Sequence, residues 1–157
     1  MSRRPEAPDN SAINTMSLNP TSYRQVFEAT PMERISMIQA GIGTRDAIRI
    51  LTDVAMPNGQ IFEALGVSKA SITRKVASDQ ILSRSESERI LGLAKLIGQV
   101  QSMTNDAEAD APAWLATWMA EPVPALGGER PINLIGTMEG QAVVSNMLGH
   151  LLRGGFA

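Results

Sequence analysis

Residues that begin and end helices recur along this chain from position 30 onward, and the apolar residues between them are spaced three and four apart. Thr30-Pro-Met-Glu33 combines a capping box with a proline in the first helical turn, and Ser83-Arg-Ser-Glu86 is a second capping box. Met56-Pro-Asn-Gly59 is typical of a helix end. Since no segment alternates apolar and polar residues over the length of a strand, the sequence predicts an all-α fold.

The expected helices are mostly short, and each begins at a residue suited to a helix N-terminus. Gly41 and Gly43 end the first helix, and Thr44 caps the second, which places Ile48, Leu51 and Ala55 on one face. Further helices are expected over residues 60–65, 68–78, 83–103, 110–121 and 137–152. In the last helix, a continuous apolar stripe is formed by Val143, Val144, Met147, Leu148, Leu151 and Leu152.

The 157-residue chain is 43% hydrophobic, which suits one domain or two small, closely packed ones with a real core. Residues 1–29 are rich in Ser, Pro, Asn, Asp and Thr and have little periodicity. We therefore expect a flexible N-terminal arm there, with at least its first 20 residues disordered. An acidic linker at residues 105–111 separates an expected domain at residues 30–105 from a second one at residues 106–157.

The composition narrows the class of protein. There is no cysteine, so disulfides and thiolate metal sites are excluded, and no apolar run approaches the ~20 residues of a membrane span. The N-terminus lacks the apolar stretch of a signal peptide, so we expect a soluble, cytoplasmic protein with no membrane partner. A net charge of −2 does not suit a general nucleic-acid binder, although residues 1–100 are slightly basic and residues 101–157 acidic.

Residues 61–76 have the pattern of a helix-turn-helix. Gly66 supplies the positive φ of the corner. Five aliphatic residues supply the packing between the two helices: Ile61, Leu65, Val67, Ile72 and Val76. The second helix then exposes six side chains that can reach phosphates and base edges in a major groove: Ser68, Lys69, Ser71, Thr73, Arg74 and Lys75.

Two observations leave a second interpretation of this segment open, in which two core helices are joined by a glycine turn and the basic residues only solvate one face. Phe62 occupies a position where simple helix-turn-helix proteins prefer a small residue such as alanine. The basic residues of the segment are also nearly balanced by Glu63 and Asp79. Because phosphate neutralisation supplies most non-specific affinity, DNA binding would require a dimer that reads a two-fold site.

The last quarter of the chain has the features of a protein-binding surface. Trp114 and Trp118 lie one turn apart on a helix, where either core packing or a share in an interface explains them. A Leu-Gly-Gly loop follows, and the final helix ends in a glycine-rich tail. In one interpretation Phe156 folds back onto the core of its own domain. In the other, residues 151–157 are a tail that inserts into the cleft of a partner.

Nothing in the sequence favours catalysis. His150 is the only histidine, and no cysteine or serine motif accompanies it to form a nucleophilic site. Asp106, Glu108 and Asp110 alternate, but they lack the glycine and the terminal glutamate of a calcium loop. Gly127-Gly128 is not a phosphate cradle, because no strand precedes it and no Gly-Lys-Ser/Thr follows it. We therefore expect a protein without enzymatic activity, metal or cofactor.

Two series of motifs run through the chain in order. The first series consists of Leu65-Gly-Val-Ser-Lys-Ala-Ser-Ile-Thr-Arg-Lys75 and Leu82-Ser-Arg-Ser-Glu-Ser-Glu-Arg-Ile-Leu91. The second consists of Trp114-Leu115, Ala125-Leu-Gly-Gly-Glu-Arg-Pro-Ile-Asn-Leu134, Thr137-Met-Glu-Gly140 and the terminal Gly-Phe-Ala. Over roughly residues 32–157 the chain resembles the Xre/MbcA/ParS antitoxins in the order and spacing of these motifs. It departs from them at Lys75, where many members carry a second arginine.

This resemblance implies an antitoxin of a prokaryotic type II toxin–antitoxin system, with an Xre-like helix-turn-helix domain followed by a small helical toxin-binding domain. Its toxin would be a RES-domain protein that consumes NAD or uses it for ADP-ribosylation. Family members commonly form homodimers through the helix-turn-helix half, and some repress their own operon by binding operator DNA. The alternative is a stand-alone helix-turn-helix transcriptional repressor whose C-terminal domain only dimerises or senses a ligand.

The resemblance also implies which residues act on the toxin. The carboxyl-terminal end of family members lies at the toxin's active-site cleft, so the inhibitory end of this chain would be Leu151, Leu152, Arg153, Gly154, Gly155, Phe156 and Ala157. The docking surface would be built or flanked by Trp114, Trp118, Leu126, Gly127 and Gly128. A Gly-Gly-Phe tail is slim enough for a narrow cleft, so inhibition would be steric and would exclude NAD.

Overall fold

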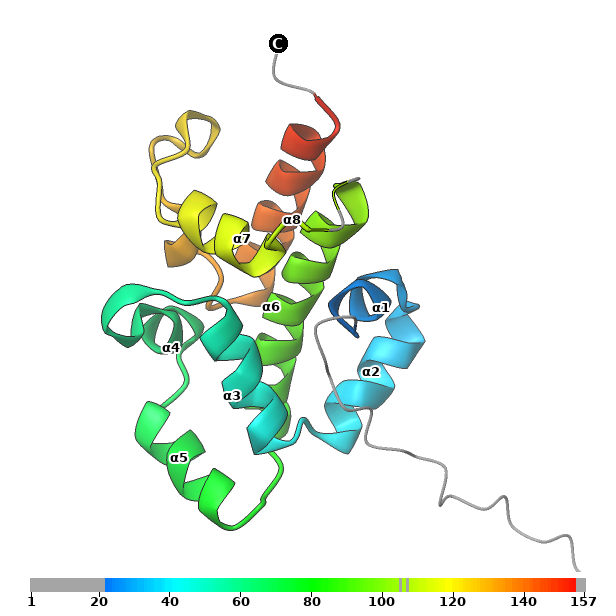
Figure 1. Ribbon diagram of the computed structural model, residues 1–157, viewed down its shortest axis with the longest axis vertical. Coiled ribbons are helices and arrows are strands. Elements are labelled where there is room, and N and C mark those ends of the chain that lie inside the picture. The colour runs from blue at the N-terminus through cyan, green and yellow to red at the C-terminus, as the bar shows by residue number, and fades with distance from the viewer. Residues whose placement is uncertain (1–21, 105, 107, 155–157) are drawn as a thin grey trace, which may run out of the picture.

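The computed structural model describes residues 22–104, 106 and 108–154, and this part of the chain is built from α-helices joined by short loops and 3₁₀ turns (Figure 1). No β-strand occurs among these residues, which confirms the all-α prediction. The α-helices are α1 (Ser22–Glu28), α2 (Pro31–Ala40), α3 (Thr44–Asp53), α4 (Gln60–Leu65), α5 (Lys69–Ala77), α6 (Arg84–Met103), α7 (Ala111–Met119) and α8 (Met138–Leu152). The 3₁₀ turns are η2 (Pro57–Gly59), η3 (Pro124–Leu126) and η4 (Pro131–Asn133).

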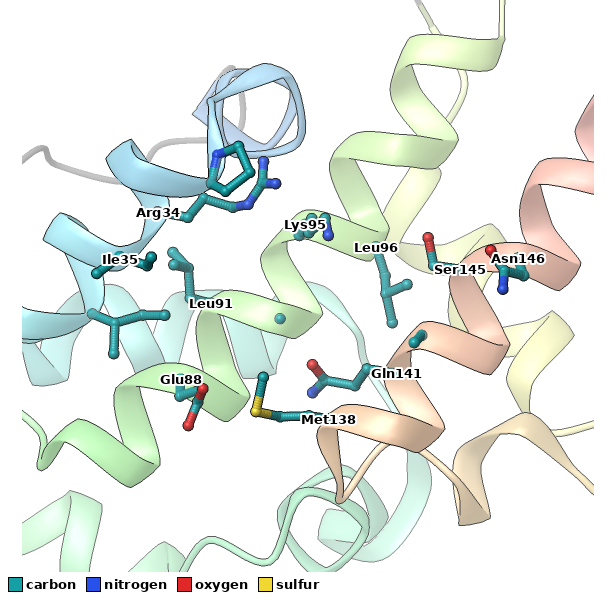
Figure 2. A pocket seen from close by; sticks show the side chains of 14 residues that line it. Arg34, Ile35, Glu88, Leu91, Lys95, Leu96, Met138, Gln141, Ser145 and Asn146 are labelled. Carbon is teal, nitrogen blue, oxygen red and sulfur yellow. The ribbon is translucent and has the colours of Figure 1, made fainter.

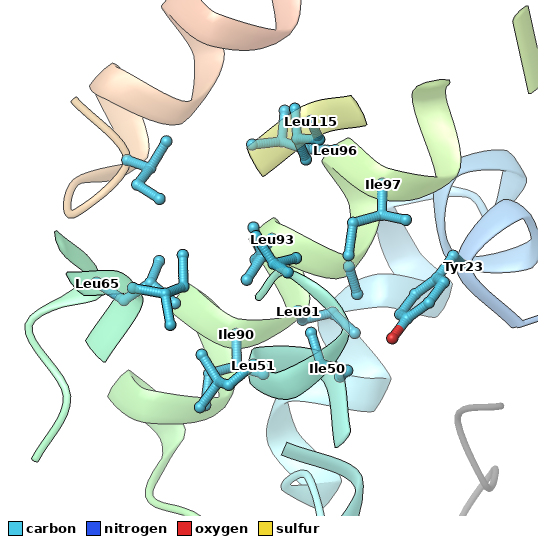
Figure 3. Packing of buried hydrophobic residues seen from close by; sticks show 14 of the residues in the cluster. Tyr23, Ile50, Leu51, Leu65, Ile90, Leu91, Leu93, Leu96, Ile97 and Leu115 are labelled. Atoms are coloured by element: carbon cyan, nitrogen blue, oxygen red, sulfur yellow. The ribbon is translucent and has the colours of Figure 1, made fainter. Parts of the chain in front are cut away.

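Helix α6 is the axis of the fold, and α1, α2, α3, α7 and α8 all pack against it (Figure 1). Its apolar residues are buried on several sides rather than along one stripe, because helices surround it. Figure 3 shows Leu93 and Ile97 of α6 among core residues that come from other helices. Those labelled neighbours include Tyr23 of α1, Ile50 of α3 and Leu115 of α7, all of them fully buried. A single core therefore connects the front and back halves of the chain.

The N-terminal boundary differs from the sequence prediction. Residues 22–28 were expected to belong to the flexible arm, but they form α1, in which Tyr23 and Val26 are fully buried. Gly98 of α6 makes this packing possible, since a Cβ there would lie 1.9 Å from the carbonyl oxygen of Tyr23. The Tyr23 hydroxyl donates a hydrogen bond of 2.6 Å to Asp53 of α3. The rest of the predicted arm, residues 1–21, lies outside the described residues.

Local capping signals explain most of the helix starts. Ser83 accepts from the backbone N–H of Glu86, whose side chain accepts from the backbone of Ser83, so the predicted capping box is present. The same first bond, from the third helical N–H to the capping side chain, is made at Thr30, Ser68, Asp110 and Thr137. Each bond satisfies one of the N–H groups that a helix start leaves unpaired.

Helix α3 departs from its predicted cap and face. Thr44 is its first residue, the cap position falls on Gly43, and the buried Thr44 hydroxyl has no hydrogen-bond partner among the described residues. The helix buries Ala47, Ile50 and Leu51, whereas Ile48 is only partly buried and Ala55 lies beyond the helix and is exposed. The buried face of α3 is therefore the one that contacts α5 and α6. It differs from the face that the spacing of its apolar residues predicts.

None of the helices described is both long and apolar enough to span a bilayer. Within the described residues, no three His, Asp or Glu side chains come together in a way that could hold a metal ion.

Candidate functional site

The helix-turn-helix segment has the predicted geometry. Gly66 ends α4 in the left-handed region with φ of 67°, and α5 begins three residues later. The predicted packing residues are buried or, for Val76, partly buried against the core. Arg89 of α6 donates to the carbonyl oxygens of Leu65 (3.2 Å) and Gly66 (2.7 Å), so the long helix holds the corner in place. The corner of the helix-turn-helix is therefore joined directly to the central helix α6.

The predicted DNA-facing residues lie together on α5 and its cap, but several of their polar groups are already used within the chain. The Ser68 hydroxyl caps α5 by accepting from Ser71, and the Thr73 hydroxyl donates to the carbonyl oxygen of Lys69 at 2.8 Å. The Lys69 ammonium is 5.8 Å from the centre of the Phe62 ring, which is within range of a cation–π contact. Phe62, the residue that looked out of place in the sequence, thus packs under a basic side chain.

Lys75 is the strongest departure from the predicted DNA surface. It is partly buried, and its ammonium forms an ion pair of 2.7 Å with Glu86 at the start of α6. Burial opposes ionisation of Glu86, but hydrogen bonds from Lys75 and Ser83 outweigh it and hold the pKa of Glu86 below its ordinary value. Arg74, by contrast, is exposed, and no ion pair joins it to another described residue. The basic surface of α5 is therefore reduced mainly to Lys69 and Arg74.

A second candidate surface lies at the other end of the molecule from α5, where α7, the loop after it and α8 meet (Figure 1). The rings of Trp114 and Trp118 stack with centroids 6.1 Å apart and planes 8° from parallel. Trp114 is 40% exposed, so the pair is not simply core packing. Trp118 leads into an apolar groove of about 240 Å³, which is lined by Trp118, Glu121, Pro122, Val123, Pro124, Met147 and Leu151. We call this the tryptophan groove.

The predicted Leu-Gly-Gly residues follow the loop that lines the tryptophan groove, but Leu126, Gly127 and Gly128 are not among its lining residues. The backbone N–H of Val123 donates to the Glu129 carbonyl at 3.0 Å, and the N–H of Gly128 donates to the Val123 carbonyl at 3.1 Å. Gly127 and Gly128 both have positive φ, at 68° and 84°, and nothing lies within 4 Å of a Cβ placed on either. These glycines are thus needed for the turn itself, and the surface around them is open. Leu126 is half-buried beside them.

The apolar residues of α8 lie on two faces of the helix. Val144 and Leu148 are buried against the core, and Leu152 is partly buried there. Met147 and Leu151 instead line the tryptophan groove, and Val143, one turn before Met147, is 40% exposed. The stripe that the sequence predicts as continuous therefore serves two purposes, one inside the fold and one on its surface.

The predicted tail begins at the end of α8. Arg153 is exposed, with its guanidinium Nε donating to the carbonyl oxygen of Gly149 at 2.7 Å. Gly154 is also exposed, with φ of 73° and open space around it. Gly155, Phe156 and Ala157 lie outside the described residues, so their predicted role is not addressed by this geometry. Among the described residues of the proposed inhibitory end, 151–154, Leu151 alone lines the tryptophan groove.

Five residues that line the groove were not among the predicted toxin-binding residues: Glu121, Pro122, Val123, Pro124 and Met147. The spacing of Met147 four residues from both Val143 and Leu151 is a helical signal that could have indicated an outward face. Residues 121–124 carry no such signal, because their position beside α8 depends on how the chain folds after α7.

Comparison with known proteins gives matches over both halves of the chain. Residues 33–95 match the model of the antitoxin Xre-like helix-turn-helix domain. Residues 100–154 match the model of the antitoxin Xre/MbcA/ParS C-terminal toxin-binding domain.

Two characterised antitoxins are also similar to the chain. One is the Prs ADP-ribosylating antitoxin of Sphingobium sp. (strain YBL2), 42% identical over 142 residues, which cover 88% of this chain and 89% of the relative. The other is antitoxin Xre of Yersinia enterocolitica serotype O:8 / biotype 1B, 28% identical over 103 residues, which cover 66% of this chain and 67% of the relative.

Proposed function

The chain belongs to the Xre/MbcA/ParS antitoxin family, and from this premise we propose that it inhibits a RES-domain toxin by placing its carboxyl-terminal end in the toxin's active site. Membership makes the chain an antitoxin with a toxin-binding domain rather than an enzyme. The proposal adds the class of the toxin, the surface that binds it and the means of inhibition.

The observation that carries the proposal is the tryptophan groove and its position. A groove lined by apolar side chains opens beside Leu151, three residues before the chain's glycine-rich end begins at Gly154. Buried aromatic and aliphatic residues supply most of the free energy of a protein interface, while exposed charges at its edge supply little. We infer that the groove and the stacked tryptophans bind the toxin, and that this contact positions the tail.

The residues of the carboxyl-terminal tail are suited to filling a narrow cleft. Its glycines keep the backbone slim, Phe156 can fill or stack in a pocket, and the terminal carboxylate can pair with groups that recognise a charged nucleotide. Occupation of the cleft would exclude NAD sterically and reversibly. The name of the Sphingobium relative favours a toxin that uses NAD for ADP-ribosylation over one that only degrades it.

Deletion of residues 154–157 tests this proposal. The truncated chain keeps all of α8, so we expect it to fold and to bind the toxin through the tryptophan groove while failing to block the toxin's reaction with NAD. Toxin binding is measured by calorimetry and NAD turnover by product analysis. A matched control removes Ala157 alone. Full inhibition by the truncated chain would contradict the plug mechanism.

Repression of the toxin–antitoxin operon is a second candidate function, favoured by the α4–Gly66–α5 geometry. We propose that a homodimer binds operator DNA through Lys69 and Arg74, with Ser68, Ser71 and Thr73 beside them. Arg74→Ala should weaken operator binding and reduce its salt dependence by about one phosphate contact per subunit. Unchanged binding would mean that another surface contacts the DNA.

The assignment of the two functions to two parts of the chain belongs to the same proposal. We propose a dimerisation and DNA-binding unit at residues 30–105 and a toxin-binding unit at residues 106–157. The two family models support this division, since the first ends at residue 95 and the second begins at residue 100. The toxin-binding match speaks against the stand-alone repressor, which would have no toxin to bind.

A further inference from the structure

A larger groove lies on the face of the molecule formed by α2, α6 and α8 (Figure 2). Its volume is about 490 Å³, and α6 forms its floor between the other two helices. We call it the α2–α6–α8 groove. Ile35 of α2 and Met138 of α8 line it and are 43% and 68% exposed. Because these apolar side chains remain in water, a segment that covered them would be stabilised by their burial.

The groove carries opposite charges at its two ends. Figure 2 shows Arg34 and Lys95 at one end and Glu88 at the other. Glu88 and Lys95 both belong to α6, and seven residues of helix separate them by ~10 Å. Both side chains are partly buried, and neither forms an ion pair with another described residue. Burial and the nearby Arg34 guanidinium lower the pKa of Lys95, so a carboxylate brought to it would stabilise its charged form.

The 21 residues before α1 lie outside the described part of the chain, but the point where they join it is fixed. Tyr23, the second residue of α1, packs its carbonyl oxygen against Gly98 of α6, 1.9 Å from where a Cβ would lie. Gly98 follows Lys95 by three residues, so the two are neighbours on the surface of α6. The preceding residues therefore join the fold beside the Lys95 end of the groove. Residues 7–21 extend to at most ~50 Å, which is far longer than the one helical turn to be crossed.

The charges of residues 1–21 occur in the order that the groove requires. The four charged side chains of this segment are Arg3, Arg4, Glu6 and Asp9. Since the segment starts from the Lys95 end and runs back toward residue 1, its acidic residues come to Lys95 first and its arginines then come to Glu88. The opposite order would have placed like charges together at both ends.

The spacing of these charges also matches. Pro5 fixes its own φ and favours an extended conformation for the residue before it. In a polyproline II conformation, which has three residues per turn, Arg3 and Glu6 lie on one face and ~9 Å apart. This is close to the separation of Glu88 and Lys95. Pro5 and Pro8 share a second face and supply an apolar surface to it.

We propose that residues 3–8 dock in the α2–α6–α8 groove of their own chain, with Arg3 beside Glu88 and Glu6 beside Lys95. The two prolines cover the apolar walls, and their fixed φ reduces the conformational entropy lost on docking. The connection through residues 7–21 holds the segment at an effective concentration of the order of millimolar, so two ion pairs and a small apolar contact are sufficient. Part of the arm that the sequence predicts to be flexible is thus held against the fold.

This contact leaves the other proposed surfaces free. Met138, Gln141 and Ser145 of α8 line the α2–α6–α8 groove, whereas Met147 and Leu151 line the tryptophan groove. None of the six residues proposed to face DNA lines the α2–α6–α8 groove. The inference is therefore independent of toxin inhibition and of operator binding, and its test uses neither partner.

A nitroxide spin label in the arm tests the inference in the full chain. The chain has no cysteine, so Ala7→Cys gives a single labelling site, and residue 7 lies on the third face of the extended segment, away from the groove. Nuclear magnetic resonance should show paramagnetic broadening of the backbone amides of Ile35 and Met138. The amide of Thr73 should be little affected, because α5 contributes no residue to the groove.

Charge reversal with rescue then tests the register. Glu88→Lys in the labelled chain should reduce the broadening at Ile35 and Met138 by at least about threefold, the effect of one exposed ion pair replaced by repulsion. Adding Arg3→Glu and Arg4→Glu to that variant should restore the broadening. The matched control is Glu63→Lys on α4, an exposed charge outside the groove, which should leave the broadening unchanged. Circular dichroism should show the same helix content in every variant.

Three results would overturn the inference. Amides of the groove that are not broadened in the labelled chain would show that the arm does not dock there. Broadening that persists unchanged in Glu88→Lys would exclude the proposed charge register. The third result comes from mixing the spin-labelled chain with an unlabelled chain that carries ¹⁵N. Broadening of the ¹⁵N chain in this mixture would mean that the groove receives the arm of another molecule rather than its own.

Discussion

The two proposed contact surfaces of this antitoxin differ in how far their side chains are already occupied. On α5, Lys75 is paired with Glu86, and the Ser68 and Thr73 hydroxyls are bonded within their own helix. Around the tryptophan groove, Trp114 and Val143 remain 40% exposed. Polar groups that are satisfied internally have little left to offer a partner, whereas apolar area in water can still be buried. We therefore expect the tryptophan groove to contribute more binding free energy to its partner than the surface of α5 does.

The largest expected effect comes from placing a charge in the tryptophan groove. Met147→Glu would bury a carboxylate against the toxin without a partner, so we expect a loss of toxin binding of about 3 kcal/mol, or roughly 100-fold. Because Met147 is only partly buried in the free chain, folding should be little affected. Calorimetric titration of the toxin measures the change.

The matched control for this variant is Ile81→Glu. It introduces the same charge at an apolar residue that is 54% exposed and lies before α6, within residues 30–105. It should leave toxin binding within about twofold of wild type. Equal losses for the two variants would remove the contrast between the regions.

A smaller effect, on stability, is expected in α6, the helix against which both halves of the chain pack. In Gly98→Ala, the new Cβ would lie 1.9 Å from the carbonyl oxygen of Tyr23, so α1 must move away from α6. We expect the free energy of unfolding to fall by about 2 kcal/mol, as for other overpacked sites. Thermal denaturation measures the change.

Gly127→Ala provides the comparison for this substitution. Nothing lies within 4 Å of the new Cβ, and only the positive φ of 68° disfavours alanine, at a cost of about 1 kcal/mol. If Gly98→Ala were no more destabilising than Gly127→Ala, the close contact between α1 and α6 would be wrong.

The smallest expected effect concerns the surface of α5, where Glu86 neutralises the charge of Lys75. Glu86→Gln removes the partner of Lys75 and returns a cation to the surface of α5. Operator affinity should rise by a few-fold at low salt, and its salt dependence should steepen by about one phosphate contact per subunit. Filter binding over a salt series measures both, and an unchanged slope would show that Lys75 does not reach DNA even when freed.

The same ion pair should affect stability with pH. The pKa of Glu86 is lowered from 4.5 in the folded chain, so its favourable contribution is present above about pH 4.5 and disappears as the carboxylate is protonated at lower pH. The wild type should therefore lose its stability advantage over Glu86→Gln as the pH falls below about 4.5. A constant difference over this range would mean that the pair contributes nothing that depends on ionisation.

Local signals in the sequence predicted much of this fold, and longer-range contacts were the part that they could not predict. Caps such as Ser68 and Thr137 act within three residues, so the helix starts could be located from sequence alone. Helix α1 was missed because it is held by contacts of Tyr23 with residues far along the chain, on α3 and α6. The Lys75–Glu86 pair was missed because its two residues belong to different helices.

The candidate site, like the fold, could be predicted from the sequence only in part. The tryptophans and the Leu-Gly-Gly loop were found from motif and residue type, but the groove forms where Trp118 and residues 121–124 lie beside Met147 and Leu151 of α8. Its walls come from two segments, residues 118–124 and helix α8, and no pattern within either segment specifies the other.

The central claim is that the end of this chain occupies the toxin's nucleotide pocket. A crystal structure of the full chain in complex with its toxin tests this most directly. We expect the tryptophan groove to lie against the toxin and residues 154–157 to fill the site where NAD binds. An open NAD site, with those residues lying against their own domain, would contradict the account.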